Sequence, residues 1–219
     1  GPLSTEKNVR PWSLHRNGYL GIAKWGGWVW SGDTESSWKT LEGQIAVGIN
    51  HSLSVSPYWG SDIGGFYPSE ELTGELYARW FQFGAFCPSF RSHGRTWWTR
   101  LPWGWGLGDM GPKENKTNPL QSEMNNPLIE PVTKKYDELR YHLLSYNYTL
   151  AWEACDKGLP FMRSLWLYYP KDSMAAKTGD EFFWGREMLI APVYEKGATN
   201  RILYLPEGMW YDWWNHTLQ

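Results

Sequence analysis

The first 95 residues alternate short apolar runs with segments in which apolar side chains recur at helical spacing. Residues 14–22 are expected to be a strand and its exit, and residues 27–30 (Gly-Trp-Val-Trp) are a short β-prone run that predicts a second strand. Two later segments carry an apolar residue every three or four positions, as on one face of an α-helix. The two stripes are Trp38, Leu41, Ile45 and Ile49, then Leu72, Leu76, Trp80 and Phe83. The second helix is expected to begin after Ser69, a good N-cap, with Glu70 and Glu71 in its first turn.

Residues 58–66 and 85–94 each predict a further strand that ends in a turn. Strands that alternate with helices in this way predict βαβ units on a parallel sheet. In a closed (β/α)8 barrel the chemistry lies where the strands end, at the C-terminal face. The polar residues that follow the strand-like runs are Arg16, Asp33, Asp62 and His93. We therefore expect these four side chains to converge on one mouth.

The alternation of predicted strands and helices ends at residue 94. Residues 94–128 show no clear period and predict a long loop, a kind of segment that is often functional. Its tryptophans could form a substrate rim or simply pack the loop; they are Trp97, Trp98, Trp103 and Trp105. Residues 130–157 carry apolar side chains at spacings of three and four, which predicts one helix ended by Gly158 and Pro160.

From residue 161 onward the chain is β-like, with short apolar runs at residues 188–193 and 201–205 separated by glycine and proline. This pattern is typical of the start of a β-sandwich. The chain ends at residue 219, before such a sandwich could close, and an unfinished sheet would leave open strand edges. We therefore expect residues 161–219 to be the beginning of a separate C-terminal domain.

Composition narrows the possible partners. The chain has 17 Trp and 13 Tyr in 219 residues, and such flat rings with one polar edge suit stacking against sugars, although a Trp-rich core is the plainer reading for any single ring. A net charge of −2 gives no reason to expect nucleic acid, and without an apolar run near 18 residues no membrane partner is expected. Cys87 and Cys155 could form a disulfide, but we expect two buried thiols. Their spacing gives no reason to expect a zinc site. No metal and no cofactor are expected.

Several motifs occur in a characteristic order. The first three are residues 30–33 (Trp-Ser-Gly-Asp), 62–66 (Asp-Ile-Gly-Gly-Phe) and 91–93 (Arg-Ser-His). Three more follow, at residues 158–163, 185–193 and 205–212. In this series the chain resembles glycoside hydrolase family 31, the family of α-glucosidases and α-xylosidases. The resemblance covers nearly the whole chain. It implies that residues 1–160 are the second half of a (β/α)8 TIM barrel, with strands 5 to 8, the long loop 94–128 and the last helix.

The resemblance also implies roles for six residues. Asp33 matches the family's general acid/base, whereas an isolated Gly-Asp pair is more often a helix cap. Arg16 matches an arginine that contacts the catalytic nucleophile and a sugar hydroxyl. Trp30 and Phe66 match residues that line the sugar pocket, and His93 matches a histidine that binds sugar hydroxyls, although a lone histidine is more often structural. Asp62 matches a buried carboxylate that orients an arginine or histidine.

One expected element is missing. The family's nucleophile is an aspartate in a Trp-x-Asp-x-Asn/Glu motif after the fourth strand, and by position it should lie upstream of residue 1. We therefore expect the first half of the barrel to be this chain's partner. The resemblance also implies a carbohydrate with terminal α-linked glucose or xylose as the substrate. Two alternatives stay open: another α-glycosidase specificity, such as galactose or a sulfonated sugar, and a sugar-binding homologue without turnover.

Overall fold

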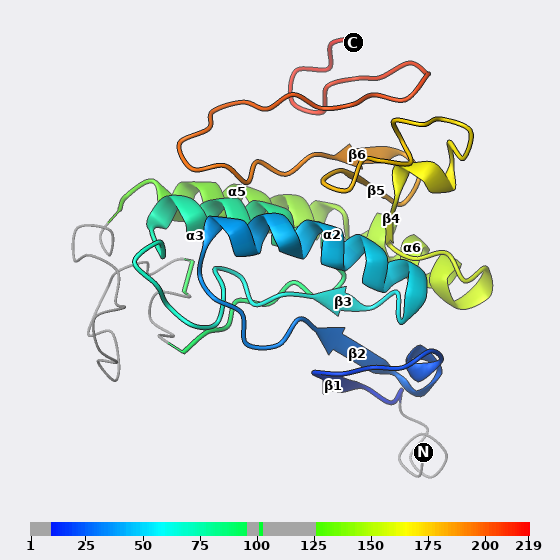
Figure 1. The fold of residues 1–219 in the computed structure, drawn as a ribbon, viewed down its shortest axis with the longest axis horizontal. Helices are drawn as coiled ribbons and strands as arrows, with labels where there is room; N and C mark the ends of the chain where they lie inside the picture. Colours follow the sequence, from blue (N-terminus) through cyan, green and yellow to red (C-terminus); the bar gives the residue numbers. More distant parts are fainter. Residues whose placement is uncertain (1–9, 96–100, 103–125) are drawn as a thin grey trace.

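The computed structural model describes residues 10–95, 101–102 and 126–219, and in these the elements form three layers (Figure 1). A parallel sheet lies at one side, helices fill the middle, and an antiparallel sheet near the C-terminus lies at the other side. One apolar core joins the layers, since Leu41 and Trp80 of the helices pack in the same cluster as Trp59 of the first sheet and Trp184 of the second. The tryptophans of the 94–128 segment, Trp97, Trp98, Trp103 and Trp105, lie outside the described residues.

The first sheet is parallel, as the sequence predicts. Its strands are β1 (Ser13–His15), β2 (Gly27–Trp30) and β3 (Trp59–Gly60), in that order. Beyond β3, Asp62 forms a parallel bridge with Arg91, which adds a fourth extended segment beside β3. The expected strand over 14–22 is shorter than predicted, because the chain turns after β1 and then forms the 3-10 helix η1 (Ile22–Trp25).

Helix α2 (Trp38–Ser54) follows β2 and buries the predicted stripe against the core. Its N-cap is Ser37, whose hydroxyl accepts a hydrogen bond from the Thr40 N–H at 3.2 Å. Asp33 is therefore not the cap of this helix.

Helix α3 (Gly74–Gly84) begins later than the sequence predicts. Thr73, not Ser69, is the N-cap and accepts a hydrogen bond from the Leu76 N–H. Ser69 and Glu71 are instead engaged by the start of α2, through Ser36 and Trp38. The predicted stripe is nevertheless buried, because Leu72 reaches the core from the turn before the helix.

The single helix predicted for residues 130–157 is two helices, α5 (Ile129–His142) and α6 (Leu144–Asp156). They meet at Leu143, whose φ and ψ of −84° and 6° leave the helical range. Leu139, Leu143 and Leu150 all remain buried, so the apolar spacing continues across the break and conceals it. Helix α6 ends as predicted: Gly158, at φ 70°, follows its last turn.

The second sheet is antiparallel and consists of β4 (Met162–Arg163), β5 (Phe182–Trp184) and β6 (Met188–Ile190). The 3-10 helix η4 (Leu165–Leu167) follows β4. The β-like run at residues 201–205 does not form a strand.

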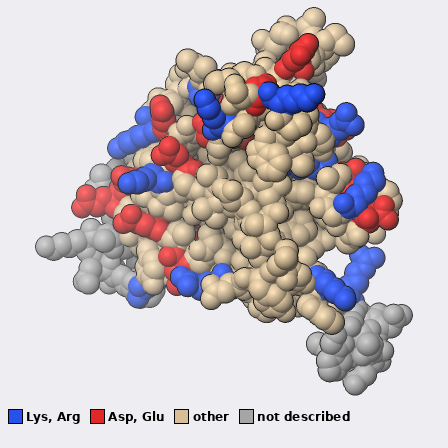
Figure 2. Space-filling model, turned by 45° about the vertical axis from the view of Figure 1, so that its right-hand side comes forward, with Lys and Arg blue, Asp and Glu red and all other residues tan. Residues whose placement is uncertain are grey.

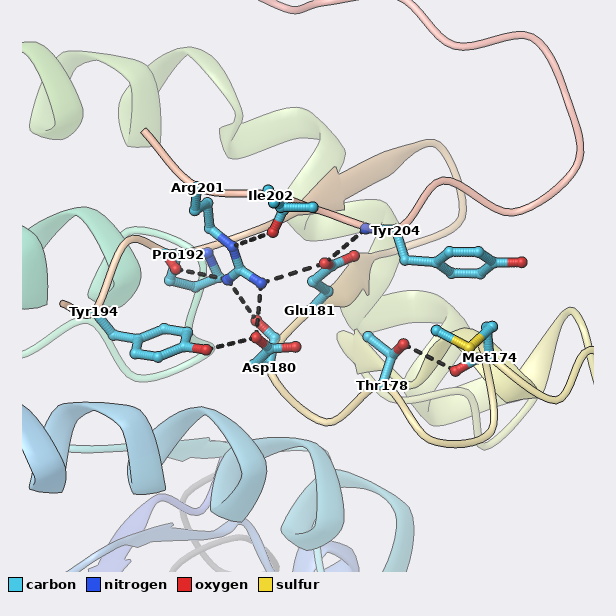
Figure 3. Close-up of polar contacts among 9 residues, drawn as sticks. All are labelled: Met174, Thr178, Asp180, Glu181, Pro192, Tyr194, Arg201, Ile202 and Tyr204. Atoms are coloured by element: carbon cyan, nitrogen blue, oxygen red, sulfur yellow. Dashed lines mark hydrogen bonds and ion pairs between the residues drawn. The ribbon is translucent and has the colours of Figure 1, made fainter. Parts of the chain in front are cut away.

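Side chains hold the 201–205 segment in place (Figure 3). The Arg201 guanidinium donates to the Asp180 carboxylate at 2.7 Å and to the Pro192 carbonyl at 2.8 Å, and the Tyr204 N–H donates to Glu181 at 2.9 Å. Glu181 is buried, and this burial raises the pKa of its carboxyl.

The expectation of two buried thiols is half wrong. Both cysteines are free, but only Cys87 is buried, whereas Cys155 on α6 is exposed, with its sulfur 3.5 Å from the Tyr58 hydroxyl. No helix in the described ranges is long and apolar enough to cross a bilayer.

Candidate active site at the strand exits

The predicted site residues lie just beyond the ends of adjacent parallel segments. Arg16 follows the last residue of β1, Asp33 comes three residues after β2, and Asp62 comes two residues after β3. His93 lies two residues after Arg91, in the fourth segment. Since the segments are parallel, their exits share one edge, where the loops after β2 and β3 both leave on the left of Figure 1.

Arg16 lies against the backbone next to Asp33. Gly32 has a φ of 80°, and a side-chain carbon there would lie 2.7 Å from Nε of Arg16 and 3.0 Å from its Cζ. Only glycine adopts this conformation readily and also leaves room for the guanidinium. Glycine at position 32 therefore lets the Arg16 guanidinium pack against the residue that precedes Asp33, and the side chains of Arg16 and Asp33 are both exposed in this chain.

Phe66 is tied to the loop that carries Asp33. The N–H groups of Phe66 and Tyr67 donate to the Thr34 carbonyl at 2.7 and 2.9 Å. Gly65, at φ 77°, allows this approach, since a side-chain carbon on it would lie 2.7 Å from the Glu35 carbonyl oxygen. The backbone of the Asp-Ile-Gly-Gly-Phe motif thus lies directly against residues 34–36.

His93 and Phe66 lie side by side, with ring centroids 5.5 Å apart and planes inclined by 41°. The Arg95 N–H donates to the Phe66 carbonyl at 3.0 Å, which ties the fourth segment to the same loop. The structure therefore brings together Phe66, His93 and the Asp33 loop.

Asp62 and Trp30 are connected through Arg91. The Asp62 carboxylate is buried and accepts a hydrogen bond from Nη2 of Arg91, and the same guanidinium lies 5.7 Å from the centre of the Trp30 ring. The Trp30 indole N–H is buried and has no hydrogen-bond acceptor among the described residues. The sequence predicted Arg91 only as part of the Arg-Ser-His motif. It did not predict that Arg91 contacts both Asp62 and Trp30.

Arg140 of α5 supports the segment that leads to His93. Its guanidinium donates to the carbonyls of Ala85 at 2.7 Å and Pro88 at 3.1 Å. Burial lowers the pKa of Arg140 to about 10, so the group remains a cation at neutral pH. Nothing in the apolar pattern marked this residue, because its partners are carbonyls more than 50 positions away.

Comparison with known proteins decides the family. Residues 2–150 match the glycosyl hydrolases family 31 TIM-barrel domain, and residues 158–219 match the glycosyl hydrolase family 31 C-terminal domain. The chain belongs to glycosyl hydrolase family 31. These matches fit a fragment of the family 31 barrel followed by the family's C-terminal domain.

Relatives with curated names are similar over nearly the whole chain. Alpha-glucosidase 2 of Bacillus thermoamyloliquefaciens is 37% identical over 206 residues, which is 94% of this chain and 23% of that protein. An alpha-xylosidase of Saccharolobus solfataricus is 34% identical over 211 residues, 94% of this chain and 26% of that protein. The chain spans about a quarter of the length of these relatives.

Solved family 31 structures have the same fold. A dextranase of Flavobacterium johnsoniae complexed with glucose superposes with a TM-score of 0.82 at 34% identity, covering 99% of this chain and 26% of that one. An alpha-xylosidase from a soil metagenome, complexed with xylose, superposes with a TM-score of 0.80 at 29% identity, covering 98% of this chain and 32% of that one.

Within the described ranges, histidines, cysteines and carboxylates nowhere gather in a group of three that could hold a metal ion.

Proposed function

We propose that the full-length protein containing this chain is a retaining, exo-acting α-glycosidase, with α-glucosides as the first expected substrates. One observation carries the proposal: Asp33 lies at the exit of β2, directly after Gly32, against which the Arg16 guanidinium packs, in a chain that belongs to family 31. The names of the similar proteins, which include an alpha-glucosidase, an alpha-xylosidase and a dextranase, support α-linked sugars as substrates.

Asp33 would act as the general acid and then as the general base. In the first step its carboxylic acid gives a proton to the leaving oxygen while a second carboxylate attacks the anomeric carbon and the glycosidic bond breaks. In the second step the Asp33 carboxylate takes a proton from water, whose oxygen attacks the same carbon and breaks the glycosyl ester. A retaining enzyme needs the two carboxyl groups about 5 Å apart.

The neighbours of Asp33 fit supporting roles. Arg16 would keep the nucleophile ionised and contact a sugar hydroxyl, which is favoured by charge-assisted hydrogen bonds. Phe66 and Trp30 would line the sugar pocket, and His93, beside Phe66, would bind sugar hydroxyls. Asp62 would act indirectly, by orienting Arg91.

We assign the nucleophile to a segment that precedes residue 1 in the full-length protein. The share of the relatives' length that the chain spans supports this assignment. In this account residues 1–160 supply strands 5 to 8 of the (β/α)8 barrel, and residues 161–219 begin a C-terminal β-sandwich. The rest of the barrel is then the partner that completes the site.

A second candidate is α-xylosidase activity, favoured by the similarity to two alpha-xylosidases, one of them solved with xylose. The two sugars differ at C6, so the choice depends on which side chains face that carbon.

The test follows product stereochemistry in the full-length protein by proton NMR. With nitrophenyl α-glucoside or nitrophenyl α-xyloside, the first sugar released is expected to be the α-anomer, which then mutarotates to the equilibrium mixture. Faster release from one substrate assigns the sugar. A β-anomer as first product would contradict the retaining mechanism, and binding of both sugars without release would indicate the sugar-binding homologue instead.

A further inference from the structure

The loops that follow β2 and β3 are joined by more than the backbone bonds already described. The Ser36 N–H donates to the Tyr67 carbonyl at 2.8 Å. Two side chains of the second loop also reach the first: the Ser69 hydroxyl donates to the Ser36 carbonyl at 2.6 Å, and the Glu71 carboxylate accepts a hydrogen bond from the Trp38 N–H at 2.8 Å. The short segment 34–38, which directly follows Asp33, is thus held along its length from one side.

The Glu71 carboxylate supplies a hydrogen-bond acceptor at the N-terminus of helix α2. Trp38 is the first residue of that helix, so its N–H has no partner within the helix. The first turn of α2 contains no acidic residue of its own, although an anion at this end is stabilised by the helix dipole. Glu71 supplies the anion from 33 residues away in the sequence.

Among the described residues, the Glu71 carboxylate bonds to α2 and not to the N-terminus of α3, which it precedes in the sequence. It precedes the Thr73 cap of α3, which already has an acidic residue, Glu75, in its first turn. Its backbone N–H donates to the Ser69 hydroxyl at 3.1 Å, so Ser69 and Glu71 form one unit that contacts both Ser36 and Trp38.

We propose that Glu71 is a positioning residue for Asp33: its carboxylate fixes the start of α2 and thereby the loop that presents the acid/base. This inference rests on the proposed function, because it assigns Asp33 the proton transfer. Proton donation requires the acid to lie within hydrogen-bond reach of the leaving oxygen. A misplacement on the order of 1 Å can cost about 100-fold in rate.

The test compares two α-glucosides that differ in their need for an acid. Methyl α-glucoside has a poor leaving group that must be protonated. The fluoride ion of α-glucosyl fluoride leaves with little help from a general acid. The ratio of kcat/KM for the two substrates reports proton donation, since kcat/KM covers steps only through glycosyl-enzyme formation. In the full-length protein, Glu71→Ala is expected to lower kcat/KM roughly tenfold for the methyl glucoside and less than about twofold for the fluoride.

Three further variants sharpen the result. Glu71→Gln keeps an oxygen that can accept from Trp38 and is expected to restore the wild-type ratio, whereas Ser69→Ala is expected to change the ratio in the same sense as Glu71→Ala. Glu70→Ala, at the neighbouring exposed position, is the matched control and should leave both substrates unchanged.

An equal loss on both substrates would mean that Glu71 serves stability alone, and no loss on either would remove it from the site; each result overturns the inference. If Glu71→Ala does not fold, the Ser69→Ala ratio decides. Asp33→Ala in the same assay separates the two proposals: if it fails to lose the methyl glucoside selectively, the proposed function itself fails, whereas a selective loss there without one at Glu71 rejects only the positioning role.

Discussion

At the scale of single residues, Arg163 shows how a buried charge can be accommodated. Its side chain is 1% exposed, and the guanidinium donates to the Pro160 carbonyl, the Tyr168 hydroxyl and the Glu153 carboxylate. Because a buried cation without such partners would be costly, these contacts constrain the chain strongly. They connect the end of α6, which follows the stretch that matches the barrel domain, to β4, which lies in the stretch that matches the C-terminal domain.

The Glu153–Arg163 pair gives a pH-dependent prediction. The hydrogen bond from Arg163 lowers the pKa of Glu153 below its ordinary value of 4.5. A carboxyl whose pKa is lowered by folding stabilises the fold above its unfolded pKa, and this contribution is lost as the pH falls through the folded value. Glu153→Gln is therefore expected to lower the free energy of unfolding by about 2 kcal/mol at pH 7, between the usual values for exposed and buried pairs.

Urea unfolding of the full-length protein at pH 7 and at pH 4 and below measures this difference, which should shrink as the pH falls. The control is Lys157→Ala, because Lys157 contacts the same carboxylate at 3.4 Å from an exposed position. This variant should stay within about 0.5 kcal/mol of wild type. A difference between Glu153→Gln and wild type that is the same at every pH would refute the ionic role of Glu153.

At the scale of elements, periodicity located the helical segments but missed the start of α3 and the break between α5 and α6. The stripes of α2 and α3 depend only on side chains that face one core, so their spacing shows directly in the sequence. The start of α3 depends on which element uses Ser69 and Glu71, and both are used by α2. The break at Leu143 leaves the buried positions in register, so the pattern contains no trace of it.

For the candidate site too, the sequence predicts some features and not others. The sequence places polar residues at strand exits, and the parallel order of β1, β2 and β3 brings those exits together. The contacts that orient the side chains are non-local: Arg91 reaches Asp62 and Trp30, and Glu71 reaches Trp38. Such contacts depend on loop paths that local sequence patterns do not encode.

At the scale of the whole molecule, the chain exposes apolar surface that a closed barrel would be expected to cover. Four side chains spaced three or four residues apart on α5 and α6 are 53–67% exposed: Tyr141, Leu144, Tyr148 and Trp152. On the face shown in Figure 2, acidic and basic side chains surround a broad uncharged centre. Contiguous apolar surface and open strand edges both favour association.

Purified residues 1–219 are therefore expected to self-associate and to hydrolyse no α-glucoside, since the proposed nucleophile lies outside the chain. Light scattering after size-exclusion chromatography measures the first property, and nitrophenyl glucoside assays measure the second. Replacing Tyr148 and Trp152 together by lysine should reduce association without creating activity. A well-behaved monomer, or measurable turnover by residues 1–219, would contradict the half-barrel account.

The central claim is that Asp33 supplies the proton, and one measurement tests it most directly. The rate of nitrophenyl α-glucoside hydrolysis is compared between the full-length protein and its Asp33→Ala variant, with and without azide. The account predicts a loss of at least about 100-fold that azide partly restores. The restored product should be the α-glucosyl azide, because a small anion can attack the glycosyl-enzyme without a general base. Near-normal hydrolysis by Asp33→Ala, with no effect of azide, would contradict the account.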